Sequence, residues 1–243
     1  MLSAVLPHNA AASHLEITIL ADEALMKPLI PLARMYAREN GVSVSVISSR
    51  LQSHSERIRG GLPVDVVVTS DNALKTSLNL AGQVDQNASG VVALDPLVVA
   101  MHTKTLRLNQ AVSLEAMLQA SQAPTLILPP MEASENEAVQ EYIDADSSLA
   151  DVPIQREDSD EAVVSALQSS ATFSILPRLH AQAMQGIRIV STLPGVHKNS
   201  GISYTALVVA SNHMKRARLL AGFLKSPRAQ KIFVENGFVA YVP

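Results

Sequence analysis

The chain has 243 residues and a formal net charge of −3 at pH 7, so its overall charge favours neither nucleic acid nor an anionic membrane as a partner. Apolar residues make up 47% of the sequence and aromatic residues only 3%, which favours α/β layers over an aromatic-rich β-sandwich. The absence of cysteine excludes disulfides and cysteine-ligated metals, and no run of 18 apolar residues is present that could span a bilayer.

The N-terminal stretch 1–14 lacks the basic start of a secretory signal peptide, although Ala10, Ala11 and Ala12 have the small-residue form of a cleavage site. We interpret it as the remnant of a truncated leader. A disordered N-terminus of a cytosolic protein is the alternative, and the sequence leaves both open.

Strands and helices alternate over the first 80 residues. Asn40 and Gly41 are suited to ending the first helix, and Asp71 to capping the third. A nearly continuous apolar strand between helices indicates burial on both faces of a parallel sheet. The predicted strands span 15–20, 42–47 and 64–68, and the predicted helices span 23–39, 52–59 and 72–80.

The alternation continues beyond a strand at 94–101, which we expect to carry the chain into a second lobe. A strand at 202–210 is predicted to bring it back, after a stretch rich in Gly, Pro, Asn and Ser. Lobe 1 would then comprise 1–97 and 201–243, and lobe 2 would comprise 98–200. Between the crossings we predict helices at 114–120, 135–143 and 160–168 and strands at 125–128, about 154, 173–176 and 187–190.

The C-terminal segment contains a clear helix signal. Ser226 is suited to the N-cap and Pro227 to the first helical position, and Gly237 can adopt the positive φ that ends a helix. This segment, 223–238, and the apolar strand with its polar turn at 61–71 are the two most informative parts of the sequence.

In their order and separation, these two segments resemble the periplasmic molybdate-binding family, solute-binding proteins of ABC transporters. The resemblance covers most of residues 15–243. It implies an α/β, two-lobed periplasmic-binding-protein-like (type II) fold, in which each lobe is a mostly parallel sheet flanked by helices and two crossing strands form the hinge. In that family serines follow the first two strands and donate to an oxyanion. Ala24 stands at the first of these positions, Arg50 and Leu51 lie at the second, and Pro177 replaces a family tyrosine.

Such a fold places its ligand between the lobes, where unpaired amides at helix N-termini favour an acceptor-rich solute. We expect the segments 21–24, 48–53, 134–136 and 158–159 to meet there, with 173–177 close by. The predicted ligand-binding residues are Asp22, Glu23, Ala24, Ser48, Ser49, Arg50, Ser53, Ser134, Asn136, Ser159 and Tyr204.

Each candidate has a plainer interpretation. Arg50 could bind a carboxylate, sulfate or phosphate with both prongs of its guanidinium, or it could be solvated. Asp22 and Glu23 could contact an amine or cation, or only complement a helix dipole. The serines and Asn136 could donate to the ligand or cap helices. The Tyr204 hydroxyl could face the cleft, or its ring could pack in the core.

Nothing in the sequence predicts an enzyme, a metal site or a cofactor. The seven histidines lack His-x-His and His-Glu-x-x-His spacing, and we expect each at the surface. Nucleophile-elbow, P-loop and dinucleotide-binding motifs are absent. An enzyme of the porphobilinogen-deaminase kind would need a cysteine for its cofactor.

We therefore predict a non-catalytic, monomeric, extracytoplasmic solute-binding protein, periplasmic in location. It would capture a small oxyanion or other small polar solute and deliver it to an ABC transporter permease. The alternative is a cytosolic ligand-sensing domain of the same fold, similar to the effector-binding part of LysR-type regulators.

Overall fold

The computed structural model describes residues 16–49, 51–105, 113–121, 123–169, 171–194 and 201–240. No helix in these ranges is long and apolar enough to cross a membrane. The strands are β1 (Glu16–Asp22), β2 (Ser43–Ser49), β3 (Val66–Thr69), β4 (Gly90–His102), β5 (Thr125–Leu128), β6 (Ile154–Arg156), β7 (Thr172–Pro177), β8 (Ile187–Thr192) and β9 (Gly201–Val208). The helices are α1 (Met26–Asn40), α2 (Leu51–Arg59), α3 (Asn72–Leu80), α4 (Leu114–Ala120), α5 (Ala133–Ala145), α6 (Asp160–Ala166), α7 (Arg178–Ala183), α8 (Met214–Leu224) and α9 (Pro227–Glu235), with short 3-10 helices η1 (Glu23–Leu25) and η2 (Ser147–Leu149).

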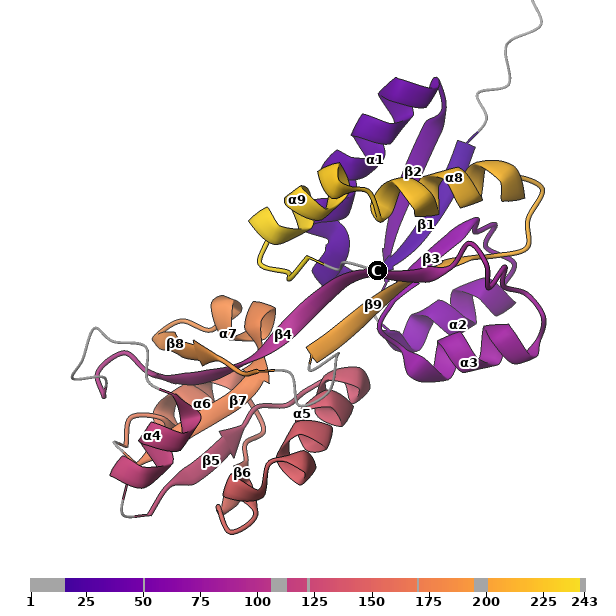
Figure 1. The fold of residues 1–243 in the computed structure, drawn as a ribbon. Coiled ribbons are helices and arrows are strands. Elements are labelled where there is room, and N and C mark those ends of the chain that lie inside the picture. The colour runs from indigo at the N-terminus through magenta and orange to yellow at the C-terminus, as the bar shows by residue number, and fades with distance from the viewer. Residues whose placement is uncertain are drawn as a thin grey trace, which may run out of the picture.

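The long strand β4 runs through both lobes (Figure 1). Its first part pairs antiparallel with β9, as far as Pro96 opposite Gly201. From Leu97 onward it pairs antiparallel with β7 and β8 instead. The strand order is β2-β1-β3-β9-β4-β7-β5-β6, with β8 also paired to β4. The predicted boundary at residue 97 stays a prediction, and this change of partner lies beside it.

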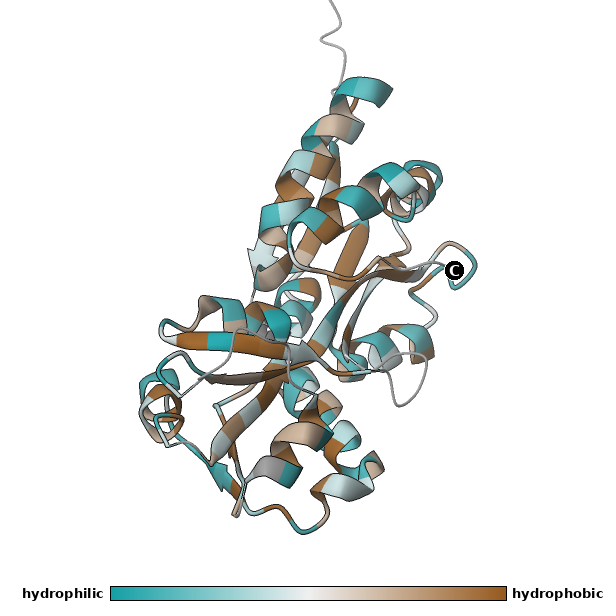
Figure 2. Cartoon of the chain, turned by 60° about the vertical axis from the view of Figure 1, so that its left-hand side comes forward, coloured by the Kyte–Doolittle hydropathy of each residue, from teal (hydrophilic) through white to brown (hydrophobic). Residues whose placement is uncertain are grey.

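Each lobe has its own apolar core, which confirms the predicted two-lobed α/β organisation. In the first lobe, Ile17, Ile19 and Phe233 are fully buried between the sheet and the helices α1, α8 and α9. In the second, Leu97 and Phe173 pack within a separate cluster. Figure 2 shows the strands as mostly hydrophobic bands covered by helices with mixed faces. Aliphatic side chains dominate both cores, as the low aromatic content predicts.

Several local predictions are confirmed by backbone geometry. The Asp71 carboxylate accepts hydrogen bonds from the amides of Ala73 and Leu74 at the start of α3. Ser226 accepts from the amide of Ala229 at the start of α9, and Gly237 follows that helix with a φ of 97°.

Two helices, α7 and α8, were not predicted. Helix α7 begins directly after Pro177 without a side-chain cap, and α8 begins after His213, also without one. Sequence signals for a helix start depend on a capping Ser, Thr, Asp or Asn, so both starts lack the usual mark. Helix α7 matters for function because it contributes to the cleft described next.

Candidate functional site

A cavity of about 780 Å³ lies between the two lobes. Ala24 of η1 and Tyr204 of β9 contribute from the first lobe, and Asp95 contributes from β4, the strand shared by both. The second lobe contributes the residues leading into α5, the start of α6 and the start of α7. The lining residues are Ala24, Asp95, Pro130, Met131, Glu132, Glu135, Asp160, Glu161, Leu179, His180 and Tyr204.

The ionisable groups of this lining are mostly acidic. Five lining residues carry carboxyl groups, and His180 is the one lining residue that can carry a positive charge; neither lysine nor arginine lines the described part of this cavity. Ala24, Pro130, Met131 and Leu179 add apolar surface. A cavity with this mixture suits an organic molecule with a polar or charged group better than a bare apolar ligand.

His180 lies between two of these carboxylates. Its Nε2 is 3.1 Å from Oδ1 of Asp160, and its Nδ1 is 3.7 Å from Oε2 of Glu135. The bond to Glu135, with further help from Asp160, outweighs burial and raises the pKa of His180 to about 9. His180 is therefore protonated at neutral pH, and its charge is already balanced by its neighbours.

Asp95 and Tyr204 form the buried floor of the cavity. Asp95 is 2% exposed and accepts from the amide of Leu179 at 3.3 Å with each carboxyl oxygen. Burial raises its pKa to about 7. Tyr204 is 4% exposed, and its ring meets that of Phe238 edge to face at 5.7 Å. Burial and the nearby carboxylates raise the pKa of Tyr204 well above its usual value, so its hydroxyl stays protonated.

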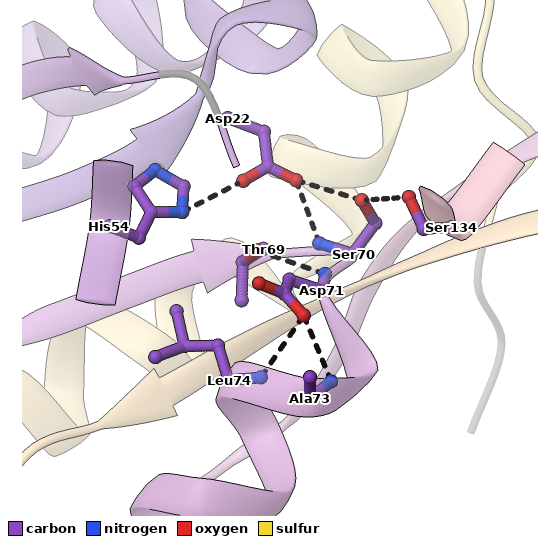
Figure 3. A network of polar contacts seen from close by, with 8 residues as sticks. All are labelled: Asp22, His54, Thr69, Ser70, Asp71, Ala73, Leu74 and Ser134. Carbon is purple, nitrogen blue, oxygen red and sulfur yellow. Dashed lines mark hydrogen bonds and ion pairs between the residues drawn. The ribbon is translucent and has the colours of Figure 1, made fainter. Parts of the chain in front are cut away.

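Another carboxylate, Asp22, is bound at the end of the first strand (Figure 3). Its Oδ2 accepts from the backbone amide of Ser70 at 2.7 Å and from the Ser70 hydroxyl at 2.9 Å. Ser134, at the start of α5, lies with its hydroxyl 3.0 Å from the Ser70 hydroxyl and so joins the second lobe to the first. Fully buried His54 has its Nδ1 3.4 Å from Oδ1 of Asp22.

The predicted ligand-binding residues are spread over several environments. Ala24 and Tyr204 line the cavity, whereas Asp22 and Ser134 belong to the network of Figure 3. Ser159 caps α6 by accepting from the amide of Ala162.

Three further candidates are not among the residues that line the cavity. Glu23 is exposed, Asn136 accepts from the guanidinium of Arg156, and Ser48 is half-buried on β2, opposite Ala21. Arg50 lies outside the described residues, as do the side chains of Ser49 and Ser53. The ligand-binding roles of all these residues stay predictions.

Sequence reasoning missed most of the acidic lining. Asp95 carried a usable signal, because it is a lone carboxylate in an otherwise apolar strand. Helix α7 was not predicted, so nothing placed His180 in the cleft. The expectation that every histidine lies at the surface is wrong for His54, which is fully buried, and for His102, which is 5% exposed. Among the described residues, no group of three or more His, Asp or Glu side chains is arranged to hold a metal ion.

Comparison with known proteins agrees with this architecture. Residues 17–239 match the profile of a family described as bacterial extracellular solute-binding protein. The molybdate-binding protein ModA of Escherichia coli K12 is 24% identical over 246 residues, covering 98% of this chain and 94% of that protein. These matches confirm the predicted resemblance.

Solved structures confirm the predicted type II fold. A substrate-binding domain assigned to a molybdenum ABC transporter of Clostridium difficile has a TM-score of 0.73 at 18% identity, covering 94% of this chain and 100% of that one. Iron-bound HitA of Pseudomonas aeruginosa has a TM-score of 0.63 at 14% identity, covering 91% and 84%.

Proposed function

Since the chain belongs to the family of bacterial extracellular solute-binding proteins, we propose that it captures a small polar solute between its lobes and delivers it to an ABC transporter permease. The observation that carries this proposal is the cavity of about 780 Å³ lined by residues of both lobes and of the strand that joins them. Closure of two lobes around a solute would remove water from it and retain it until delivery.

The relatives differ in the charge of the solutes in their names. ModA of E. coli is a molybdate-binding protein, which favours a small oxyanion here, whereas HitA with the same fold is iron-bound. The fold therefore does not decide the sign of the ligand charge. That decision belongs to the side chains lining the cleft.

We place the protein outside the cytoplasm, in the periplasm, and assign it no catalytic step. The family match supports this over a cytosolic ligand-sensing domain of the same fold. In the absence of catalysis, a bound solute should leave the protein chemically unchanged.

Dialysis of the full chain against a complex growth medium tests the proposal. The account predicts one retained small molecule per chain, identified by mass spectrometry and recovered unchanged after denaturation. Retention of no solute, or recovery of a converted product, would contradict it.

A further inference from the structure

We propose that the solute bound in the cleft is an organic cation, a small molecule with a protonated amine or guanidinium group. This inference rests on the proposed function and assigns the chemical class of its solute. It is supported by the charge of the cavity, by the carboxylates at helix starts that line it, and by a tyrosine hydroxyl that is open to it.

The carboxylates of the lining favour a cation on electrostatic grounds. Asp95, Glu135 and Asp160 come from three elements, β4, α5 and α6, and line the same cavity. An anion about 4 Å from one carboxylate is repelled by about 4 kcal/mol at an effective dielectric constant of about 20, and a cation is attracted by as much. His180 does not reverse this balance, because its one positive charge stands against the carboxylates of Glu132, Glu135, Asp160 and Glu161, so the lining stays negative even when Asp95 is protonated.

Backbone amides at helix N-termini are the groups that could otherwise bind an oxyanion here. Helix N-termini attract anions through unpaired amides and the helix dipole. At two of the helix starts that line this cavity, those of α5 and α7, the chain's own carboxylates accept from such amides. Asp95 accepts from the amide of Leu179 in α7. Outside the cavity lining, Asp71 and Asp22 likewise accept from amides at and just before the start of α3. Glu135 lies in the first turn of α5, and its carboxylate accepts from the amide of Glu132.

The Tyr204 hydroxyl is a further polar group that lines the cavity. Tyr204 is 4% exposed, lines the cavity and forms no hydrogen bond with any described residue, and its ring packs against that of Phe238. The hydroxyl oxygen is open to the cavity and not sealed in the core, so a group of the ligand can complete its hydrogen bonding. With its proton retained, Tyr204 can accept from an ammonium or guanidinium N–H beside the carboxylates.

Cavity size and lining favour an organic solute over a metal ion. About 780 Å³ falls in the range of pockets for small organic molecules. The described residues contain no three-ligand His, Asp or Glu group for a metal. Apolar Pro130, Met131 and Leu179 can cover a carbon skeleton while the carboxylates hold its charged end.

Titration calorimetry of the full chain at pH 7 tests the inference. Agmatine and putrescine serve as organic cations, molybdate and sulfate as anions, and Mn²⁺ as a metal. We expect one-to-one binding of at least one organic cation and none of the anions. Glu135→Gln should weaken that binding at least about tenfold, which corresponds to about 1.4 kcal/mol. Tyr204→Phe, which keeps every carboxylate, should weaken it several-fold.

The matched control is Glu141→Gln, because Glu141 lies on the same helix with its side chain exposed to solvent. It should leave the affinity unchanged. If Glu135→Gln fails to fold, as shown by circular dichroism, Tyr204→Phe and Asp160→Asn decide the matter. Binding of molybdate or sulfate in place of the cations would overturn the inference and leave the proposed function intact. Binding of Mn²⁺ alone, or cation binding unchanged in every cleft variant, would also overturn it. Failure of every probe would count against the proposed function as well.

Discussion

Asp95 is a carboxyl group held inside an apolar strand, with its neighbours in β4 buried on both faces of the sheet. Burial raises its pKa to about 7, whereas an unfolded aspartate ionises near pH 3.9. Between these values the folded state binds more protons than the unfolded state, so this group lowers stability as pH rises from about 4 to 7. A cost of this kind is expected where a buried charge serves binding rather than folding.

Replacing Asp95 by asparagine should therefore stabilise the protein in a pH-dependent manner. The difference in unfolding free energy between Asp95→Asn and the parent should grow from pH 4 to 7, by about 4 kcal/mol at most, and level off above pH 8. Urea unfolding at pH 4.5, 6 and 8 measures it. Exposed Asp151, changed to asparagine, is the control and should show no such trend. A difference that is constant over this range would show that burial does not raise the pKa of Asp95.

The Asp22 carboxylate accepts from the amide and the hydroxyl of Ser70, two donors that would otherwise be open to an oxyanion. Asp22→Ala should cost about 1–3 kcal/mol because the buried amide of Ser70 loses its acceptor. The same change should give the protein a measurable affinity for sulfate, seen as a rise in melting temperature with sulfate over chloride at equal ionic strength. Glu23→Ala, at the next position along the chain and exposed, should show neither effect. Equal responses of the two variants to sulfate would contradict the role given to Asp22.

At the scale of elements, the sequence predicts whatever depends on local chemistry. Asp71 and Ser226 are caps because a short acceptor before an apolar helix has few other uses, and both were found by pattern alone. Helices α7 and α8 lack such caps and were missed. Strand β4 was predicted too short, since its N-terminal part is identified only by pairing with β9, more than 100 residues later.

The crossing of β4 and β9 offers a sharp test of the hinge. Gly201 has a φ of 148°, and a Cβ atom there would lie 2.4 Å from the carbonyl oxygen of Asp95. Gly201→Ala should destabilise the protein by more than about 2 kcal/mol, through steric overlap and backbone strain. Gly222→Ala, in helix α8 with open space around it, should instead stabilise by about 0.5–1 kcal/mol. Thermal unfolding of both variants checks this, and equal effects would contradict it.

At the scale of the whole molecule, the two lobes were predictable and the charge of the cleft was not. Alternating strands and helices predict the α/β lobes, and two apolar strands that carry the chain into the second lobe and back to the first predict their boundaries. The charge of the cleft arises because ionisable residues far apart in the sequence meet only after folding. Glu135 lies 40 residues after Asp95, and His180 lies 45 residues after Glu135. Arg50, the strongest sequence candidate for an anion contact, lies outside the described residues, so its role stays a prediction.

Among the hydrogen bonds that join the lobes, two link the start of α5 to the segment before and at the start of α3. Ser134 contacts Ser70, and the amide of Asn72 donates to Glu137 at 2.9 Å. Removing both with Ser134→Ala and Asn72→Ala should favour an open arrangement by about 1–3 kcal/mol. Small-angle scattering should then show a larger radius of gyration. Ser113→Ala, which removes a helix cap within the second lobe, should leave that radius unchanged. An unchanged radius in the double variant would mean that these bonds do not control closure.

Competition in a single equilibrium dialysis tests the central claim most directly. The full chain is dialysed at pH 7 and about 0.15 M salt, which screens its net negative charge, against equimolar agmatine, putrescine, molybdate and sulfate. The account predicts an excess of one organic cation on the protein side, approaching one per chain, with neither oxyanion enriched. An excess of molybdate or sulfate, with both amines at equal concentration across the membrane, would contradict it.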